Sequence, residues 1–226
     1  MTKKTAFERD LVFVDLETSG FNPDTQDILE IAAIRTTSDA VTIGGRFERK
    51  VLPVNIQSAD PQALVINRYN PEHWLKHGVS LDEALDGFLN ICFGGVTLVA
   101  HSATFDWGFL RAALTRKSLL ADLDYHIICT ASLAWPLVMR GEVVSPKLET
   151  LCTHFGISNE GQHSAMCDVE RMLEVYRQLV PVRALNNQAN CEYCRMLIRS
   201  PELFVGMKCS VHETKSEAPE IPVKPG

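Results

Sequence analysis

The pattern of apolar positions changes period along the first 180 residues of the chain. Short apolar runs at 11–16, 28–34 and 41–51 predict three strands, and Gly44-Gly45 introduces an irregularity in the third. Short segments rich in turn residues separate these runs, so we expect an antiparallel meander.

Helical spacing replaces the strand pattern after residue 80. Ser80 followed by Glu83 forms a capping box in front of an amphipathic run. Further along, we expect a strand at 96–100, a helix at 105–114, a strand near 127–128, and helices at 148–155 and 165–179. This order predicts an α/β fold in which helices pack on a mixed sheet.

Composition changes after Pro181, where the predicted domain of residues 1–181 closes. Residues 182–190 read as a polar linker, and residues 191–212 form a short cysteine-bearing segment. Residues 213–226 hold three prolines and no aromatic residue, so we expect a disordered tail.

Charge and targeting signals narrow the class of protein. The chain of 226 residues carries a net charge of −6, which argues mildly against tight, non-specific binding of nucleic acid. The apolar run that follows Lys3 and Lys4 is too short for a secretory signal, and no run is long enough to span a membrane. Seven cysteines, an odd number, favour free thiols over a disulfide framework. We therefore expect a soluble, cytoplasmic protein.

Two carboxylates end the first predicted strand. Asp15 and Glu17 are two residues apart, so their side chains lie on the same face of the strand. Such a pair is repulsive unless a cation lies between the two groups, and oxygen ligands suit Mg²⁺ or Mn²⁺. The ordinary alternative is a solvated strand end with two surface acids.

Two further acids begin predicted helices. Asp106 follows the strand at 96–100, and Asp168 lies in the first turn of the last helix, with His163 just before it. Each has an ordinary explanation, because acids favour first helical turns and a single histidine there is more often structural.

Taken together, these fragments resemble the DEDDh family of 3′→5′ exonucleases, which includes polymerase proofreading subunits and RNase T. The resemblance covers residues 11–180 and rests on Asp15-Leu16-Glu17, on Asp106 within 101–106, and on the His-x-Ala-x-x-Asp spacing of 163–168. It implies a ribonuclease H-like mixed five-stranded sheet flanked by helices. It also implies release of nucleoside monophosphates from single-stranded 3′ ends of DNA or RNA, with a polymerase or another protein as a partner in a proofreading role.

The resemblance also implies roles for individual residues. Asp15 would bridge two Mg²⁺ or Mn²⁺ ions, Glu17 and Asp168 would complete one metal site, and Asp106 would help to position the other ion. His163 would act as the general base. The segment from Leu16 to Thr18 would hold the terminal nucleotide. Phe105 would either stack on a base or pack in the core, and core packing is the favoured alternative.

Two positions depart from the family pattern. Ser102 stands where an asparagine is usual, which puts substrate positioning in question more than catalysis. Cys129 stands where an aspartate is frequent, but this position is not one of the four expected metal ligands.

The cysteine-bearing segment has the spacing of a structural Zn²⁺ site. Its candidate ligands are Cys191, Cys194, Cys209 and His212. The alternatives are a tail without metal and a redox pair formed by Cys191 and Cys194. This segment is not part of the exonuclease pattern, so its role stays open.

Two other functions compete with the favoured one. RNA trimming is the alternative to DNA proofreading or repair, and nothing in the sequence reads the 2′-hydroxyl that separates the two substrates. A non-catalytic binding module on a nuclease fold is the second alternative, and loss of an acidic ligand would have favoured it. The oligomeric state is not readable from the sequence.

Overall fold

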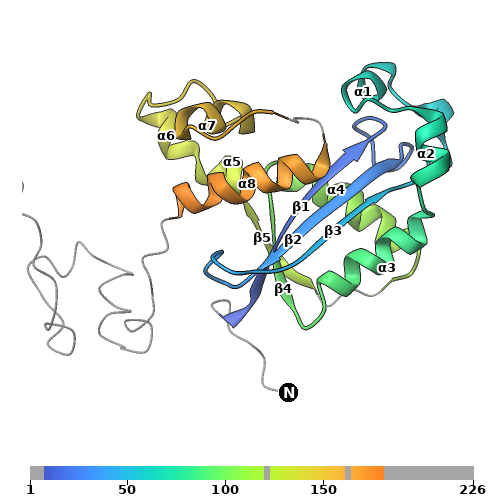
Figure 1. The fold of residues 1–226 in the computed structure, drawn as a ribbon, viewed down its shortest axis with the longest axis horizontal. Coiled ribbons are helices and arrows are strands. Elements are labelled where there is room, and N and C mark those ends of the chain that lie inside the picture. Colours follow the sequence, from blue (N-terminus) through green and yellow to red (C-terminus); the bar gives the residue numbers. More distant parts are fainter. Residues whose placement is uncertain (1–7, 120–122, 161–163, 181–226) are drawn as a thin grey trace, which may run out of the picture. The chain divides into compact units, whose positions relative to one another are not determined.

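A five-stranded mixed sheet forms the centre of the computed structural model, which describes residues 8–119, 123–160 and 164–180 (Figure 1). The strand order is β3-β2-β1-β4-β5. The strands are β1 (Asp10–Thr18), β2 (Ile28–Thr36), β3 (Ile43–Lys50), β4 (Val96–Ala100) and β5 (Leu123–Cys129). β1, β2 and β3 pair antiparallel, whereas β4 and β5 join in parallel. The predicted meander and mixed sheet are both confirmed.

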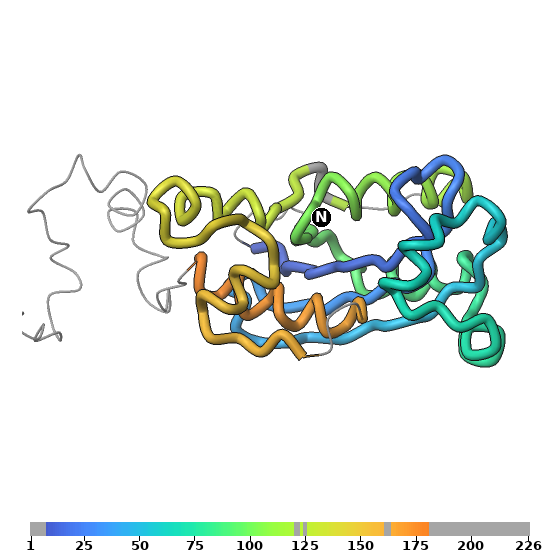
Figure 2. Tube along the Cα trace, turned by 90° about the horizontal axis from the view of Figure 1, so that it is seen from above, coloured from blue at the N-terminus to red at the C-terminus, as the bar shows by residue number. Residues whose placement is uncertain are grey.

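Helices cover both faces of the sheet. They are α1 (Pro61–Ile66), α2 (Pro71–His77), α3 (Leu81–Ile91), α4 (Ala103–Arg116), α5 (Thr130–Leu133), α6 (Trp135–Met139), α7 (Leu148–Phe155) and α8 (Ala165–Leu179). Figure 2 shows α4, in green, on one side of β1 and α8, in orange, on the other. The expected helices at 80–92, 105–114, 148–155 and 165–179 therefore correspond to α3, α4, α7 and α8.

The alternation of side chains along β1 divides the core into two clusters. Val12, Val14 and Leu16 pack with residues of α3 and α4 in one cluster. Leu11 and Phe13 pack with α8 in the other, where the rings of Phe13 and Tyr176 meet edge to face at 5.2 Å. β1 is thus covered on both sides, as expected for a central strand of an α/β domain.

Local signals in the sequence set several of the element boundaries. The backbone N–H of Glu83 donates a hydrogen bond of 3.2 Å to Ser80 Oγ, which confirms the predicted cap of α3. The Gly44 irregularity is also confirmed, since the β2–β3 register shifts there, from Arg35 opposite Gly45 to Thr36 opposite Ile43.

The structure adds four short helices that the apolar pattern did not predict: α1, α2, α5 and α6. α1 and α2 fill the connection between β3 and α3. Asp60 and Asn70 cap these two helices by accepting hydrogen bonds from backbone N–H groups, and each is followed by proline. Helices of six and seven residues are too short to show a clear apolar period.

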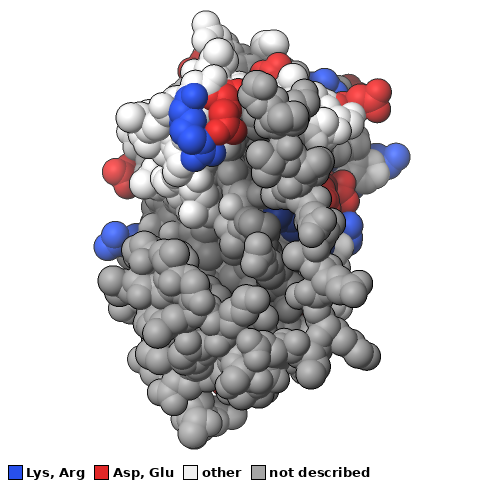
Figure 3. All heavy atoms as spheres, turned by 90° about the vertical axis from the view of Figure 1, so that its left-hand side faces the viewer, with Lys and Arg blue, Asp and Glu red and all other residues white. Residues whose placement is uncertain are grey.

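Cysteine and charge distributions agree in part with expectation. Cys92, Cys129, Cys152 and Cys167 are free, but only Cys92 and Cys152 are fully buried. On the face shown in Figure 3, basic and acidic side chains of the described residues lie side by side instead of forming a field of one sign. No helix within the described ranges is both long enough and apolar enough to cross a membrane.

Candidate active site

Asp15 and Glu17 project from the C-terminal half of β1, on the face that α8 covers. The period of two that places Leu11 and Phe13 in the core under α8 carries these two carboxylates to the same side. Glu17 is only 9% exposed and Asp15 is half-buried. The strand therefore changes from apolar to acidic along one face without changing its direction.

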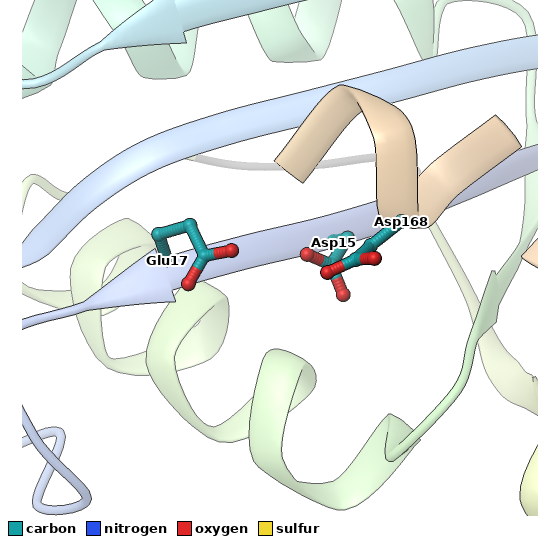
Figure 4. Close-up of side chains that lie close together, drawn as sticks. All are labelled: Asp15, Glu17 and Asp168. Atoms are coloured by element: carbon teal, nitrogen blue, oxygen red, sulfur yellow. The ribbon is translucent and has the colours of Figure 1, made fainter. Parts of the chain in front are cut away.

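Asp168 reaches the same place from the first turn of α8. Carboxylate oxygens of Asp15, Glu17 and Asp168 all lie within 4.8 Å of one another. Figure 4 shows the two β1 side chains and the α8 side chain pointing into one shared space. Residues more than 150 positions apart in the sequence thus form one group of oxygen donors.

Asp106 approaches the group from the other side of β1. It lies in the first turn of α4 and is 3% exposed. Its carboxylate accepts hydrogen bonds from its own backbone N–H and from that of Leu16, and both bonds act to lower its pKa. The trio that shares the 4.8 Å limit does not include Asp106. Its charge nevertheless acts on both β1 acids and raises the pKa of each.

Burial and mutual repulsion shift these acids together. Desolvation is the largest cause that raises the pKa of Asp15 well above its ordinary value, followed by the charges of Asp106 and Glu17. Desolvation and then the charge of Glu30 raise the pKa of Glu17 to about 7. Desolvation also raises the pKa of Asp106 to about 7. The metal-free site therefore resists full ionisation near neutral pH.

This set of donors fits divalent cations. Closely spaced, half-buried carboxylates are costly when ionised, and a cation between them removes both the repulsion and part of the desolvation penalty. Among the described residues, the group contains carboxylate oxygens and neither a thiol nor an imidazole. Such a set of donors suits Mg²⁺ or Mn²⁺ better than a soft metal. The protein thus has an acidic cluster suited to binding divalent metal.

Arg171 is a neighbour of this cluster that the apolar pattern did not single out. It lies one turn after Asp168, with which it forms an ion pair, and it is buried. Its Nη1 also donates a 3.3 Å hydrogen bond to the backbone oxygen of Asn159. A buried arginine three residues after a candidate ligand is a signal that the spacing alone could have provided.

The loop after β1 is fixed by hydrogen bonds around the predicted nucleotide-binding segment. Asn67 Nδ2 donates to the backbone oxygen of Thr18 at 2.8 Å, and Thr18 Oγ1 donates to that of Gly20 at 2.6 Å. Gly20 has φ of +156°, and a Cβ there would lie 2.0 Å from the Gln26 side chain. Any other residue would strain the backbone at this position and displace the Gln26 side chain.

Two phenylalanines lie beside this loop. Phe105 is half-buried, with its ring centroid 5.1 Å from that of Phe109 in the core. On its other side it meets Phe21 edge to face at 6.0 Å, and Phe21 is 80% exposed. Phe105 does pack, while Phe21 is an exposed aromatic residue that the sequence interpretation overlooked.

The two residues that depart from the family pattern, Ser102 and Cys129, form hydrogen bonds with nearby backbone groups. Ser102 precedes α4, and its backbone oxygen accepts a 2.7 Å hydrogen bond from Phe105 N. Cys129 Sγ donates to the backbone oxygen of His101 at 3.3 Å. His101 itself bonds Thr130 Oγ1 through Nδ1, and burial lowers the pKa of His101 to about 4. His101 is therefore neutral at physiological pH and is held by structural contacts.

Some predicted residues lie outside the described ranges. They are the candidate general base, His163, and the four candidate zinc ligands, Cys191, Cys194, Cys209 and His212. The linker and tail predicted at 182–190 and 213–226 lie outside them as well.

Comparison with known proteins relates this geometry to a family. A family model described as an exonuclease, of the RNase T type, matches residues 12–176. Ribonuclease T of Enterobacter sp. (strain 638) is 32% identical over 182 residues, which cover 75% of this chain and 80% of that protein.

Solved structures of exonuclease I share the fold. E. coli exonuclease I in complex with a dA16 oligonucleotide superposes with a TM-score of 0.66 at 18% identity, over 83% of this chain and 45% of that one. A complex of exonuclease I with SSB-Ct gives a TM-score of 0.62 at 18% identity, over 77% of this chain and 42% of that one. This chain thus spans less than half the length of those proteins. Motifs, fold and family model agree that the chain belongs to the RNase T-like family of 3′→5′ exonucleases, as its sequence predicts.

Proposed function

We propose that this chain is a DEDDh-type 3′→5′ exonuclease that releases nucleoside monophosphates from single-stranded 3′ ends. The observation that carries the proposal is the convergence of Asp15, Glu17 and Asp168, whose carboxylate oxygens lie within 4.8 Å of one another. Asp106 adds a fourth buried carboxylate that interacts with the first two. A cluster of this kind is costly for folding, and cation-assisted hydrolysis of a phosphodiester accounts for it.

Asp15, Glu17, Asp106 and Asp168 would hold two Mg²⁺ or Mn²⁺ ions. Bound there, the ions would activate water and stabilise the charge on the leaving 3′-oxygen. Arg171 forms an ion pair with Asp168, which restricts the orientation of that carboxylate. The hydrogen bond from Leu16 N–H similarly fixes Asp106.

His163 would take the proton from the attacking water. An imidazole titrates near the working pH, whereas each nearby carboxylate is needed as an ionised ligand. His163 precedes α8 by two residues and Asp168 by five, so the same stretch of chain supplies both the base and a ligand. His101 is a poor substitute because its pKa is lowered by burial to about 4.

The terminal nucleotides would bind at the loop after β1. The segment from Leu16 to Thr18 would hold the terminal nucleotide, and the exposed ring of Phe21 offers a surface on which a base can stack. The ring of Phe105 contacts that of Phe21 edge to face. The dA16 complex of exonuclease I supports a single-stranded substrate, and its SSB-Ct complex supports a protein partner. The name ribonuclease T supports RNA as a substrate.

The test is a digestion assay on labelled oligonucleotides. Matched single-stranded RNA, single-stranded DNA and duplex DNA, each labelled at the 3′-terminal nucleotide, are incubated with the full chain and Mg²⁺ or Mn²⁺. We expect metal-dependent release of labelled monophosphate from single strands, and the ratio of RNA to DNA rates gives the preference. Release of nothing from any substrate by folded protein would favour a non-catalytic binding module instead.

A second test addresses the base. His163→Ala is expected to lower kcat by on the order of 10²–10⁴-fold and to leave Mn²⁺ binding unchanged. At saturating Mn²⁺, which keeps the carboxylate ligands ionised, the low-pH limb of the kcat profile should also disappear, because that limb then reports protonation of the base. If the limb persists in the variant, another group is the base.

Zn²⁺ binding by Cys191, Cys194, Cys209 and His212 stays a separate proposal. These four residue types and their spacing suit a structural site. Elemental analysis of the purified full chain should give one zinc per chain, and Cys191→Ser should lose it. Full exonuclease activity without zinc would show that the segment is dispensable for catalysis.

A further inference from the structure

A partly buried ion pair lies directly beside Glu17 on the sheet. In the strand register, Glu17 faces Glu30 on β2, and Glu30 in turn faces Lys50 on β3. Residues opposite each other in antiparallel strands share a face, so all three lie on the same side of the sheet as Asp15. Lys50 Nζ contacts Glu30 Oε2 at 2.8 Å. Glu30 is 3% exposed, which makes it as inaccessible as the core residues around it.

Lys50 is fixed in this position by an aromatic ring. Its Nζ lies 4.4 Å from the ring centroid of Trp74, over the indole face. Trp74 is itself held, because its Nε1 donates a 3.0 Å hydrogen bond to the backbone oxygen of Leu29. α2 therefore holds the Lys50 ammonium beside Glu30 and Glu17, the acids that lie next to each other on the sheet.

The acids around the pair carry more negative charge than Lys50 alone can balance. Glu30 Oε1 is buried and has no hydrogen-bond donor among the described residues. Glu48, two residues before Lys50, adds a second carboxylate next to Glu30, and burial, followed by the contact with Glu30, raises the pKa of Glu48. The charge of Lys50 opposes the raised pKa values of Glu17 and Glu48, so this one cation acts on two of the neighbouring acids. A buried carboxylate with an unused oxygen is costly and calls for a functional reason.

We propose that Glu30 and Lys50 are positioning residues that set the affinity of the neighbouring site for divalent cations. Glu30 cancels the positive charge of Lys50, which would otherwise repel a cation at Glu17. Lys50 in turn offsets part of the negative charge beside Glu17 and so limits the affinity of the site for a cation. This inference rests on the proposed function, because it takes Glu17 as a metal ligand.

Direct titration of the full chain with Mn²⁺ tests the inference without relying on activity. Glu30→Gln leaves Lys50 uncompensated, so we expect the Mn²⁺ dissociation constant to rise on the order of tenfold. Lys50→Met should bind Mn²⁺ at least as tightly as the unaltered chain. The double variant Glu30→Gln/Lys50→Met restores a neutral pair and should return close to the original affinity. A purely structural pair would weaken Mn²⁺ binding in both single variants, whereas the proposed role predicts changes in opposite directions.

The chain offers a matched control on another surface. Lys117 and Asp82 form an exposed ion pair of 2.9 Å at the end of α4 farthest from Asp106. Asp82→Asn and Lys117→Met change the net charge by the same amounts and should leave Mn²⁺ affinity unchanged. Should Glu30→Gln fail to fold, the same comparison is made between Lys50→Met and the double variant, and Lys50→Met is expected to bind more tightly.

The outcomes separate this inference from the function on which it rests. If the unaltered chain binds Mn²⁺ but Glu30→Gln binds equally well, or the double variant is not rescued, the role of the pair is refuted and the metal site stands. If the unaltered chain binds no Mn²⁺, the metal site and the inference both fail.

Discussion

The two faces of β1 differ in what they contribute, although nine consecutive residues build both. Val12, Val14 and Leu16 are buried against α3 and α4, so that face is apolar along the middle of the strand. The other face begins with Leu11 and Phe13 and then changes to carboxylates at Asp15 and Glu17. The apolar face provides stability, and the mixed face gives up stability to hold charge. A single strand can do both because its side chains alternate.

The largest expected effect is on kcat and follows from removing a carboxylate from the acidic face of β1. Asp15→Ala should lower kcat by on the order of 10⁴-fold, the size of loss seen when an essential carboxylate of a catalytic unit is removed. Without metal, its melting temperature should stay level or rise, because a self-repelling group is gone. Activity assays and thermal unfolding in EDTA measure both. A large drop in metal-free stability would show that Asp15 is structural.

The pH dependence of stability tests the energetic cost of the acids around β1 without any mutation. The pKa values of Glu17 and Asp106 are raised to about 7 in the folded chain, so between pH 4 and 7 the folded state binds more protons than the unfolded state. Metal-free stability should therefore be undiminished below this window and fall as pH rises through it, by about 2–4 kcal/mol. Urea unfolding in EDTA at pH 5 and pH 8 measures the change.

The double variant Glu17→Gln/Asp106→Asn sharpens this measurement, because its metal-free stability should depend less on pH. Added Mg²⁺ should also stabilise the unaltered chain most at high pH. Stability that rises from pH 5 to pH 8 in EDTA would contradict the raised pKa values.

An intermediate effect is expected on the apolar face. Val12→Ala removes two methyl groups from a fully buried position and should cost about 2 kcal/mol of unfolding free energy. Its kcat and Mn²⁺ affinity should match those of the unaltered chain, which is the reverse of the outcome for Asp15→Ala. Chemical unfolding combined with the digestion assay tests this. Loss of activity in a folded Val12→Ala chain would show that the two faces are coupled.

The smallest effect concerns the loop that continues β1. Phe21→Ala should raise KM for single-stranded substrate about tenfold, the size expected from loss of one base-stacking contact. Stability should hardly change because Phe21 is 80% exposed. Phe93→Ala is the matched control, since Phe93 is 81% exposed and lies just before β4, which pairs with the other end of β1. Equal KM values for both variants would remove Phe21 from the substrate path.

Regular spacing of residues in the sequence predicted the parts of the fold that depend on strand and helix periods. Asp15 and Glu17 share a face because of the strand period, and Asp168 lies in the first turn of α8, as expected. Family motifs, not periodicity, predicted that these residues meet in space. Roles for the predicted site residues stay predictions, and His163 and the zinc ligands lie outside the described ranges.

Other parts of the fold could not be predicted from apolar periodicity, for physical reasons. α1 and α2 are too short to show a period, although Asp60-Pro61 and Asn70-Pro71 were signals of helix starts. Glu30 lies in an apolar run and was read as part of the strand at 28–34. Its relation to Glu17 and Lys50 depends on strand register, which a single sequence does not determine.

The placement of Trp74 has a practical consequence for anyone who works with this chain. Its indole is buried, carries the Lys50 ammonium on its face, and through Lys50 is linked to Glu30 on the strand next to Glu17. Emission from a shielded indole responds to the local electric field, so arrival of a doubly charged ion at the acids should shift its spectrum. Conservative replacement of Trp107 and Trp135, which lie on α4 and α6, would leave Trp74 as an intrinsic optical sensor that needs no added dye.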